Sequence, residues 1–323
     1  MKRIIHVVLL GVLFWGKAEG QQAIQYSLYM LNPYSYNPAV AGIDNNVEAT
    51  GVFRQQWVGL EGAPTTIGVH FQLPVYIIHS GVGLNVENDN IGAFRFTTVR
   101  AGYNYIVKMG EGSLSFGLRA GIVQSALDGS KLRTPDGNYN QGLIVHNDNA
   151  LAGNLGSGMT PTFEAGVYYK GEKLYAGVSA NNLAEPSLSY NGDKTVQFVL
   201  KRNYYLTVGT QIDIRSNISF HPSVLLKSDG TETQADFSGF LRYNDNIFLG
   251  GSFRGYNQPS KDAFVIFGGF KLNSKLILAY SYDFTLSSIK NSSEGTHEIL
   301  LRYRTEAIFG KGKLPPIIYN PRF

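Results

Sequence analysis

The sequence predicts an all-β protein, a transmembrane outer-membrane β-barrel of about 14 antiparallel strands. The 323 residues include 37 Gly, 20 Tyr and 19 Phe, a composition typical of β structure with tight turns. Segments of about ten residues with alternating polarity recur along the chain. An export signal is followed by no apolar stretch of the roughly 20 residues that a spanning helix needs. Free solution and a closed barrel remain as destinations.

Residues 1–20 have the three parts of a secretory signal peptide. Met1–Arg3 is basic, Ile4–Trp15 is apolar, and Ala18–Gly20 supplies small residues for cleavage before Gln21. The sequence contains no Cys that could carry a lipid or form a disulfide. We therefore expect an exported chain whose mature part begins near Gln21.

Residues 21–46 precede the first predicted strand and are rich in aromatic side chains. Pro33 and Pro38 each follow an Asn, and proline pushes the preceding residue to an extended conformation, so one long helix is excluded. We expect a plug in the lumen or a docking strip at the periplasmic mouth, against the simpler alternative of space-filling. The partner-binding candidates here are Tyr26, Tyr29, Asn37 and Pro38.

Residues 47–305 carry the strand pattern of the transmembrane barrel. Fourteen segments are predicted, at 47–57, 64–73, 80–88, 94–107, 112–127, 160–170, 172–181, 201–214, 217–228, 232–243, 246–254, 262–271, 275–284 and 294–305. An even number is what single-chain outer-membrane barrels require. Alternation is clearest where Leu206 and Val208 face away from Tyr205 and Thr207.

The predicted connections differ in length between the two ends of the barrel. Every second connection is short, whereas those at 128–159 and 181–200 are long. Short turns on one side and long loops on the other are typical of outer-membrane barrels. This asymmetry favours a membrane barrel over a secreted soluble β protein, which would also show alternating strands.

Residues 306–323 form a Pro-rich tail that we expect on the periplasmic side. Three prolines exclude a paired strand there, so the terminal aromatic residue does not lie in the last strand of the barrel. An extended Pro-rich segment with apolar side chains is suited to partner contact, although an unattached or barrel-packed tail is the simpler alternative. The partner-binding candidates in the tail are Pro315, Pro316, Tyr319 and Phe323.

The sequence offers no enzyme, metal or cofactor motif of the familiar kinds. Asp283 and Glu298 lie on adjacent predicted strands and are expected to face the lumen together. Because Arg302 and Arg304 follow on the same face, we interpret the group as a charge-balanced wall rather than an acid pair for catalysis. Only 16% of the residues are charged, against about 25% on average, and no nucleic-acid partner is expected.

Short stretches along nearly the whole mature chain resemble the PorP/SprF family of type IX secretion system outer-membrane proteins. Their common order carries the resemblance, since no single stretch is specific. They are Gln21–Gln22 with Tyr26–Met30 and Asn37–Gly42, Arg54–Trp57 with Gly62–Thr66, Leu114–Gly117, Asn181–Leu183, Pro222–Ser223, Gly250–Arg254, Tyr280–Asp283 and Gly295–Glu298.

The resemblance implies a non-enzymatic barrel in the outer membrane of a Gram-negative bacterium, in contact with outer-membrane lipid. Its expected partners are the periplasmic type IX machinery of secretion and gliding motility, or secreted adhesins with C-terminal secretion domains that reach and stay on the surface. The alternative from another class is a channel or transporter for small hydrophobic or polar solutes, since about 14 strands enclose a usable lumen.

Overall fold

The computed structural model describes residues 24–133, 136–138, 145, 156–190, 193–257 and 260–306. Its strands are β1 (Asn46–Gln55), β2 (Thr65–Val75), β3 (Ser80–Ile91), β4 (Phe94–Met109), β5 (Gly112–Leu127), β6 (Ser157–Lys170), β7 (Leu174–Asn181), β8 (Ser187–Tyr190), β9 (Asp193–Val199), β10 (Asn203–Thr210), β11 (Ile212–Arg215), β12 (Ile218–Ser228), β13 (Thr233–Tyr243), β14 (Ile247–Arg254), β15 (Ala263–Lys271), β16 (Leu276–Thr285) and β17 (Thr296–Glu306). Short 3-10 helices are η1 (Tyr29–Leu31), η2 (Pro33–Ser35), η3 (Pro38–Val40), η4 (Tyr76–Ile78), η5 (Gly129–Lys131) and η8 (Ser288–Asn291).

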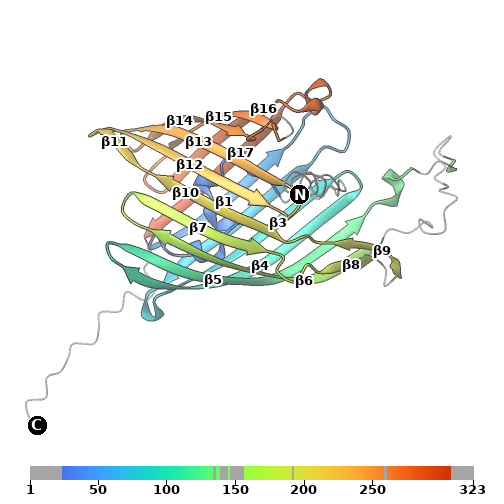
Figure 1. Ribbon diagram of the computed structural model, residues 1–323, viewed down its shortest axis with the longest axis horizontal. Coiled ribbons are helices and arrows are strands. Elements are labelled where there is room, and N and C mark those ends of the chain that lie inside the picture. The colour runs from blue at the N-terminus through green and yellow to red at the C-terminus, as the bar shows by residue number, and fades with distance from the viewer. Residues whose placement is uncertain are drawn as a thin grey trace, which may run out of the picture.

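The strands close into an antiparallel barrel (Figure 1). Neighbours in sequence pair along most of the sheet, β1 pairs with β17, and β10 pairs with β12 to complete the ring. Since β10 and β11 are separated by Gln211 alone and both pair with β12, they form one strand of the wall. The wall therefore has 14 strands, which confirms the predicted number.

The two ends of the barrel differ as the connection lengths predicted. At one end, which we call the turn end, no connection between strands exceeds four residues. The other end, the loop end, carries the long connections β5–β6 and β7–β10. Within the latter, β8 and β9 form a separate hairpin that the sequence did not reveal (Figure 1).

The distribution of polarity is the reverse of that in a soluble protein. Leu206 and Val208 are 42% and 41% exposed on the outer face, whereas Thr207 between them is buried in the lumen. Arg54, Arg119 and Arg254 are among the largest fully buried side chains. An apolar exterior with a polar interior is the pattern of a barrel surrounded by lipid.

The N-terminal segment, residues 24–45, lies inside the barrel. It contacts strands on opposite sides of the ring through hydrogen bonds to Glu87 on β3, Ser179 on β7, Ser223 on β12 and Glu298 on β17. A segment that contacts strands on several sides of a closed ring runs through the middle of its lumen. Among the residues that the structure describes, no helix is long and apolar enough to cross a membrane.

Candidate functional site

The N-terminal segment runs along the lumen from the loop end to the turn end. Ile24 lines a cavity together with Trp57 and Pro64 of the β1–β2 loop, and Asn45 leads directly into β1 at the turn end. Two prolines shape the path, since Pro33 begins η2 and Pro38 begins η3. The resulting series of single turns presents backbone groups in many directions, and the barrel wall supplies their partners.

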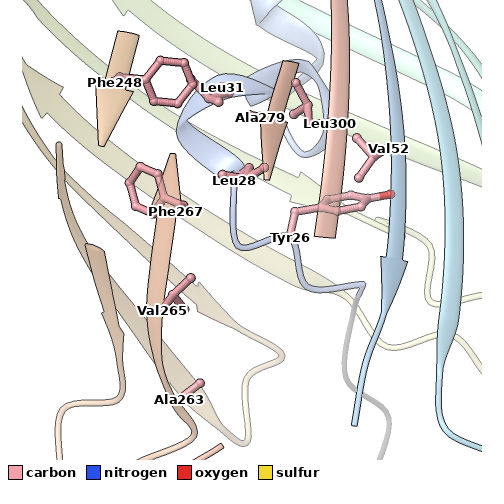
Figure 2. Packing of buried hydrophobic residues seen from close by; sticks show 10 residues of the cluster. All are labelled: Tyr26, Leu28, Leu31, Val52, Phe248, Ala263, Val265, Phe267, Ala279 and Leu300. Carbon is pink, nitrogen blue, oxygen red and sulfur yellow. The ribbon is translucent and has the colours of Figure 1, made fainter. Parts of the chain in front are cut away.

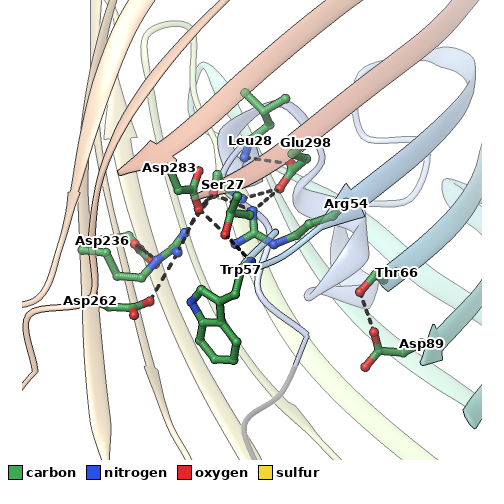
Figure 3. Close-up of polar contacts among 12 residues, drawn as sticks. Ser27, Leu28, Arg54, Trp57, Thr66, Asp89, Asp236, Asp262, Asp283 and Glu298 are labelled. Carbon is green, nitrogen blue, oxygen red and sulfur yellow. Dashed lines mark hydrogen bonds and ion pairs between the residues drawn. The ribbon is translucent and has the colours of Figure 1, made fainter. Parts of the chain in front are cut away.

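Near the loop end, Ser27 lies among five buried charged residues, and we call these six residues the seam cluster: Ser27, Arg54, Asp236, Arg254, Asp283 and Glu298. Figure 3 shows Ser27 beside Arg54, Asp283 and Glu298. The Ser27 backbone N–H donates to Glu298 Oε2 at 2.7 Å, and its hydroxyl donates to Asp283 Oδ2 at 2.7 Å. Arg54 Nη1 donates to the Ser27 hydroxyl oxygen at 2.9 Å. One serine thus links the segment to β1, β16 and β17.

Arginine neutralises the carboxylates of the seam cluster. Arg54 forms ion pairs of 3.0 Å with both Asp283 and Glu298. Arg254 bonds Asp236 at 2.7 Å and approaches Asp283 at 3.3 Å. Each charge has an opposite partner, which is the condition under which buried charges are tolerated.

A second group of buried charges holds the middle of the segment from the opposite wall. Glu164 on β6 pairs with Arg100 and Arg119, and Arg100 also pairs with Glu87. Arg119 Nη1 donates to the Tyr34 carbonyl oxygen at 2.9 Å, so the charged wall reaches the backbone of the segment. The Tyr26 hydroxyl donates to Glu87 at 2.9 Å. Burial raises the pKa of the Tyr26 hydroxyl, and it stays protonated as a donor.

Glycines in the wall make room for the second half of the segment. A Cβ on Gly81 would lie 1.9 Å from the Ala41 carbonyl oxygen, one on Gly117 would lie 2.4 Å from the Ala39 nitrogen, and one on Gly166 would lie 2.2 Å from Asn37 Oδ1. These glycines are on β3, β5 and β6. The absence of side chains there allows the backbone of η3 to approach the strands closely.

Asn37 and Asn104 join η3 to the wall across this glycine surface. Asn37 Oδ1 accepts from the Ala39 backbone N–H at 2.9 Å as the N-cap of η3, and its Nδ2 donates to the Val167 carbonyl at 3.2 Å. Asn104 Nδ2 donates to the carbonyls of Ala39 and Ala41 at 2.7 and 2.8 Å. The barrel wall therefore satisfies the backbone carbonyls of Ala39 and Ala41.

At the turn end the segment is held by Asp44, which pairs with Lys170 of β6 and with Arg304 of β17. Burial opposes ionisation of Asp44, but Lys170 and Arg304 outweigh it and hold the pKa of Asp44 below its ordinary value. The charged form is stabilised at neutral pH.

Apolar packing fixes the same segment against one side of the ring (Figure 2). Leu28 and Leu31 are buried against Phe248, Phe267 and Leu300, which come from β14, β15 and β17. These wall residues face inward, in contrast to the apolar residues that face outward elsewhere. The lumen thus has its own small hydrophobic core, and the segment completes it.

The sequence-predicted candidates fall into two groups. Tyr26, Tyr29, Asn37 and Pro38 are all buried in the lumen, where Tyr29 bonds Ser223 and Asn37 caps η3. They contact the barrel itself and do not lie on its outer surface. The tail candidates fall outside the described residues; they are Pro315, Pro316, Tyr319 and Phe323.

Asp283 and Glu298 do face the lumen together, as the alternation indicated. Their cations, however, are Arg54 and Arg254 instead of Arg302 and Arg304. Arg304 pairs with Glu48 and Asp44 near the turn end, and Arg302 donates to the Leu31 carbonyl at 2.9 Å. The actual ion pairs could not be predicted from the sequence, because Arg54 is 229 residues away from Asp283.

Several solved structures resemble the fold at low sequence identity. They include the toluene transporter TbuX of Ralstonia pickettii (11% identity, 87% of this chain and 94% of that chain covered, TM-score 0.46) and a mutant of the monoaromatic hydrocarbon channel TodX (14%, 88% and 95%, 0.45). The outer membrane protein Omp33 of Acinetobacter baumannii is a third (6%, 80% and 97%, 0.43). No curated protein matches the sequence.

A family model gives a more specific match. The model described as type IX secretion system membrane protein PorP/SprF matches residues 18–303, which include the N-terminal segment and nearly all of the barrel wall. This range also contains Ser27, Arg54, Asp283 and Glu298 of the seam cluster. The chain therefore belongs to the PorP/SprF family of type IX secretion system membrane proteins.

Proposed function

We propose that the protein is a non-enzymatic outer-membrane component of the type IX secretion system. It supports the secretion and surface attachment of partner adhesins, or it docks the periplasmic machinery of secretion and gliding. Membership of the family supports the link to the secretion system, and the apolar exterior of a closed barrel supports an outer-membrane location.

The observation that carries this proposal is the filled lumen. Residues 24–45 are bonded to the wall at the loop end through Ser27, in the middle through Tyr34, and at the turn end through Asp44. A cargo chain that threaded the barrel would need the space that this segment occupies. Work on cargo therefore takes place at the two ends of the barrel, and translocation takes place elsewhere in the machinery.

The two ends are suited to different partners. Short turns are typical of the periplasmic side of outer-membrane barrels and long loops of the outside, so we assign the turn end to the periplasmic machinery and the loop end to surface adhesins. The signal peptide expected over residues 1–20 would direct export of the chain. The Pro-rich tail, with Pro315, Pro316, Tyr319 and Phe323, would follow β17 on the periplasmic side.

The test compares a strain that lacks the gene with one complemented by the wild-type protein. We expect loss of surface adhesins in the deletion strain and their return on complementation, measured by antibody labelling of intact cells. Purification of the tagged protein from outer membranes is expected to recover periplasmic type IX components. Normal adhesin display in the deletion strain, with none of these components recovered, would contradict the proposal.

A second candidate function is a channel for small solutes. Two cavities of about 380 and 450 Å³ beside the first residues of the segment favour it. The proteins can be compared in planar bilayers, with the wild type beside a variant that lacks residues 24–40. Conductance in the wild type would favour the channel, whereas a closed wild type and a conducting variant would favour the secretion role.

A further inference from the structure

The N-terminal segment and the barrel wall enclose a cavity of about 380 Å³ in the lumen, on the loop-end side of the segment. Its floor is formed by Tyr26, Tyr29 and Tyr36 of that segment. The Tyr29 hydroxyl is fixed by Ser223 at 3.0 Å, and the Tyr36 ring stacks on Tyr205 with 5.7 Å between centroids. The segment closes the cavity toward the turn end.

One wall of the cavity is aromatic. Phe94 and Phe96 of β4 lie beside Phe198 of β9, with ring centroids 5.9 and 5.5 Å from that of Phe198. Val123 and Leu200 also line the cavity, and Phe96 and Phe198 pack against them. All three phenylalanines are half-buried, so their rings offer apolar area to the cavity. Such a wall accepts an apolar or aromatic group.

The facing wall carries a lysine, Lys227. Lys227 on β12 lines the cavity, and among the described residues its ammonium group makes no hydrogen bond or ion pair. Lys227 is opposite Gln234 in the pairing of β12 with β13, and the nearby Asp236, two residues further along β13, is already bonded to Arg254 at 2.7 Å. In the ring, four strands separate β4 from β12 on one side and eight on the other, so Phe96 and Lys227 come from different sides of the lumen.

The charge of Asp89 determines at which wall of the cavity an anionic group of a ligand would bind. Asp89 lies opposite Phe96 in the pairing of β3 with β4, and its carboxylate accepts a hydrogen bond from the Thr66 hydroxyl at 2.5 Å (Figure 3). An anionic group placed at the aromatic wall would be repelled by Asp89, whereas one placed at the facing wall would be attracted by Lys227.

We propose that this cavity binds an amphipathic carboxylate, with an apolar or aromatic body against Phe94, Phe96 and Phe198 and the carboxylate on Lys227. Two sources supply this chemistry, a small free aromatic acid and the C-terminal carboxylate of a peptide that ends in an apolar residue. The proposal goes beyond the secretion role and does not depend on it, since binding is measured on the purified barrel alone.

Trp57 provides a built-in reporter. It lines a second cavity of about 450 Å³ that shares Lys227, Asp89, Ile24 and Gln25 with the first. We would titrate the purified full-length protein in detergent with 3-phenylpropionate and follow tryptophan fluorescence and heat. The matched probe is the neutral 3-phenylpropanamide. A second pair of probes is a Gly-Ser-Gly-Phe peptide with a free or an amidated C-terminus.

We expect each carboxylate to bind at least tenfold more tightly than its amide. Lys227→Met keeps the apolar stem and removes the charge, so it should abolish this preference. Phe198→Ala, on the hairpin outside the barrel wall, should weaken acid and amide alike by several-fold. Lys173→Met is the control, because Lys173 pairs with Asp213 at the turn end, far from the cavity.

Tighter binding of the small acid than of the peptide assigns a free aromatic acid as the ligand, and the reverse order assigns a peptide terminus. Equal affinity for acid and amide, unchanged preference in Lys227→Met, or no binding of either acid would overturn the proposal. Circular dichroism and heat-modifiable gel mobility establish that each variant is folded before it is titrated. Any of these failures leaves the adhesin experiment unaffected.

Discussion

Arg54 shows most clearly how a single residue holds the lumen together. It is 1% exposed and pairs with both Asp283 and Glu298. Arg54→Met would leave two buried carboxylates without their main cation, and removal of one partner from a buried pair costs about 3–5 kcal/mol. We expect a loss of that order in the free energy of unfolding, measured by urea titration of the refolded barrel.

The control for this change is Arg242→Met. Arg242 pairs with Asp245 at the turn end, and the Asp245 side chain is 73% exposed. Exposed pairs contribute about 0–1 kcal/mol, so a small effect is expected. Equal losses in the free energy of unfolding for the two variants would show that the ion pairs of Arg54 stabilise the barrel no more than an exposed pair does.

Val208 tests the assignment of the outer face. It lies near the middle of the wall strand formed by β10 and β11 and is exposed on the exterior. Val208→Arg is expected to destabilise the barrel in lipid by about 2–4 kcal/mol, while Ile214→Arg near the turn end should cost about 0–1 kcal/mol. Unfolding titrations in bilayers give both values. Identical costs would mean that Val208 does not lie near the membrane midplane.

The sequence predicts some of these residue roles and not others. The outward orientation of Leu206 and Val208 follows from local alternation, which any strand displays. The pairing of Arg54 with Glu298 spans 244 residues and depends on the meeting of the first and last strands. Local periodicity carries no information on which inward-facing charges meet across a closed ring.

At the scale of elements, the wall strands could be predicted because each is long enough to show its period. Hairpin β8–β9 was not predicted from the sequence, because β8 has only four residues and its flanks resemble a polar loop. The path of the N-terminal segment along the lumen could not be predicted either. Its aromatic content and Asn-Pro steps indicate irregular, buried structure, but its partners are distributed over strands that are far away in the sequence.

Gly81 tests the fit of this segment into the wall. Gly81→Ala would place a methyl group 1.9 Å from the Ala41 carbonyl oxygen, so η3 would have to move. We expect faster cleavage of residues 24–45 by added protease, with the barrel still folded by circular dichroism. Gly51→Ala is the matched control, because its nearest contact would be 4.0 Å away. Equal cleavage of the two variants would contradict a tight fit at Gly81.

Asp44 makes the stability of the segment at the turn end depend on pH. Its pKa is lowered in the folded protein despite burial, because Lys170 and Arg304 lie beside it. This contribution to stability is complete above the pKa of the unfolded chain and is lost as the pH falls through the folded pKa. Between about pH 5 and about pH 2, wild-type stability should fall more steeply than that of Asp44→Asn. Parallel curves would exclude a contribution from Asp44.

At the scale of the whole molecule, the tail is expected to act separately from the barrel. The wall is complete at Glu306, which pairs with Asn46. Removal of residues 314–323 should leave heat-modifiable, folded barrel in the outer membrane but reduce the periplasmic type IX components that co-purify with it. A variant with residues 314–323 replaced by Gly and Ser controls for length. Failure of the truncated chain to assemble would instead identify Phe323 as part of the insertion signal.

The position of Ser27 has a consequence for closure of the ring. Its partners Arg54 and Glu298 belong to β1 and β17, the two strands whose meeting shuts the ring. Ser27 can therefore make its full set of hydrogen bonds only when β1 and β17 are paired. Closure of the ring and fixing of residues 24–45 in its lumen are thus coupled energetically, and Arg54 takes part in both because it bonds Ser27 and Glu298.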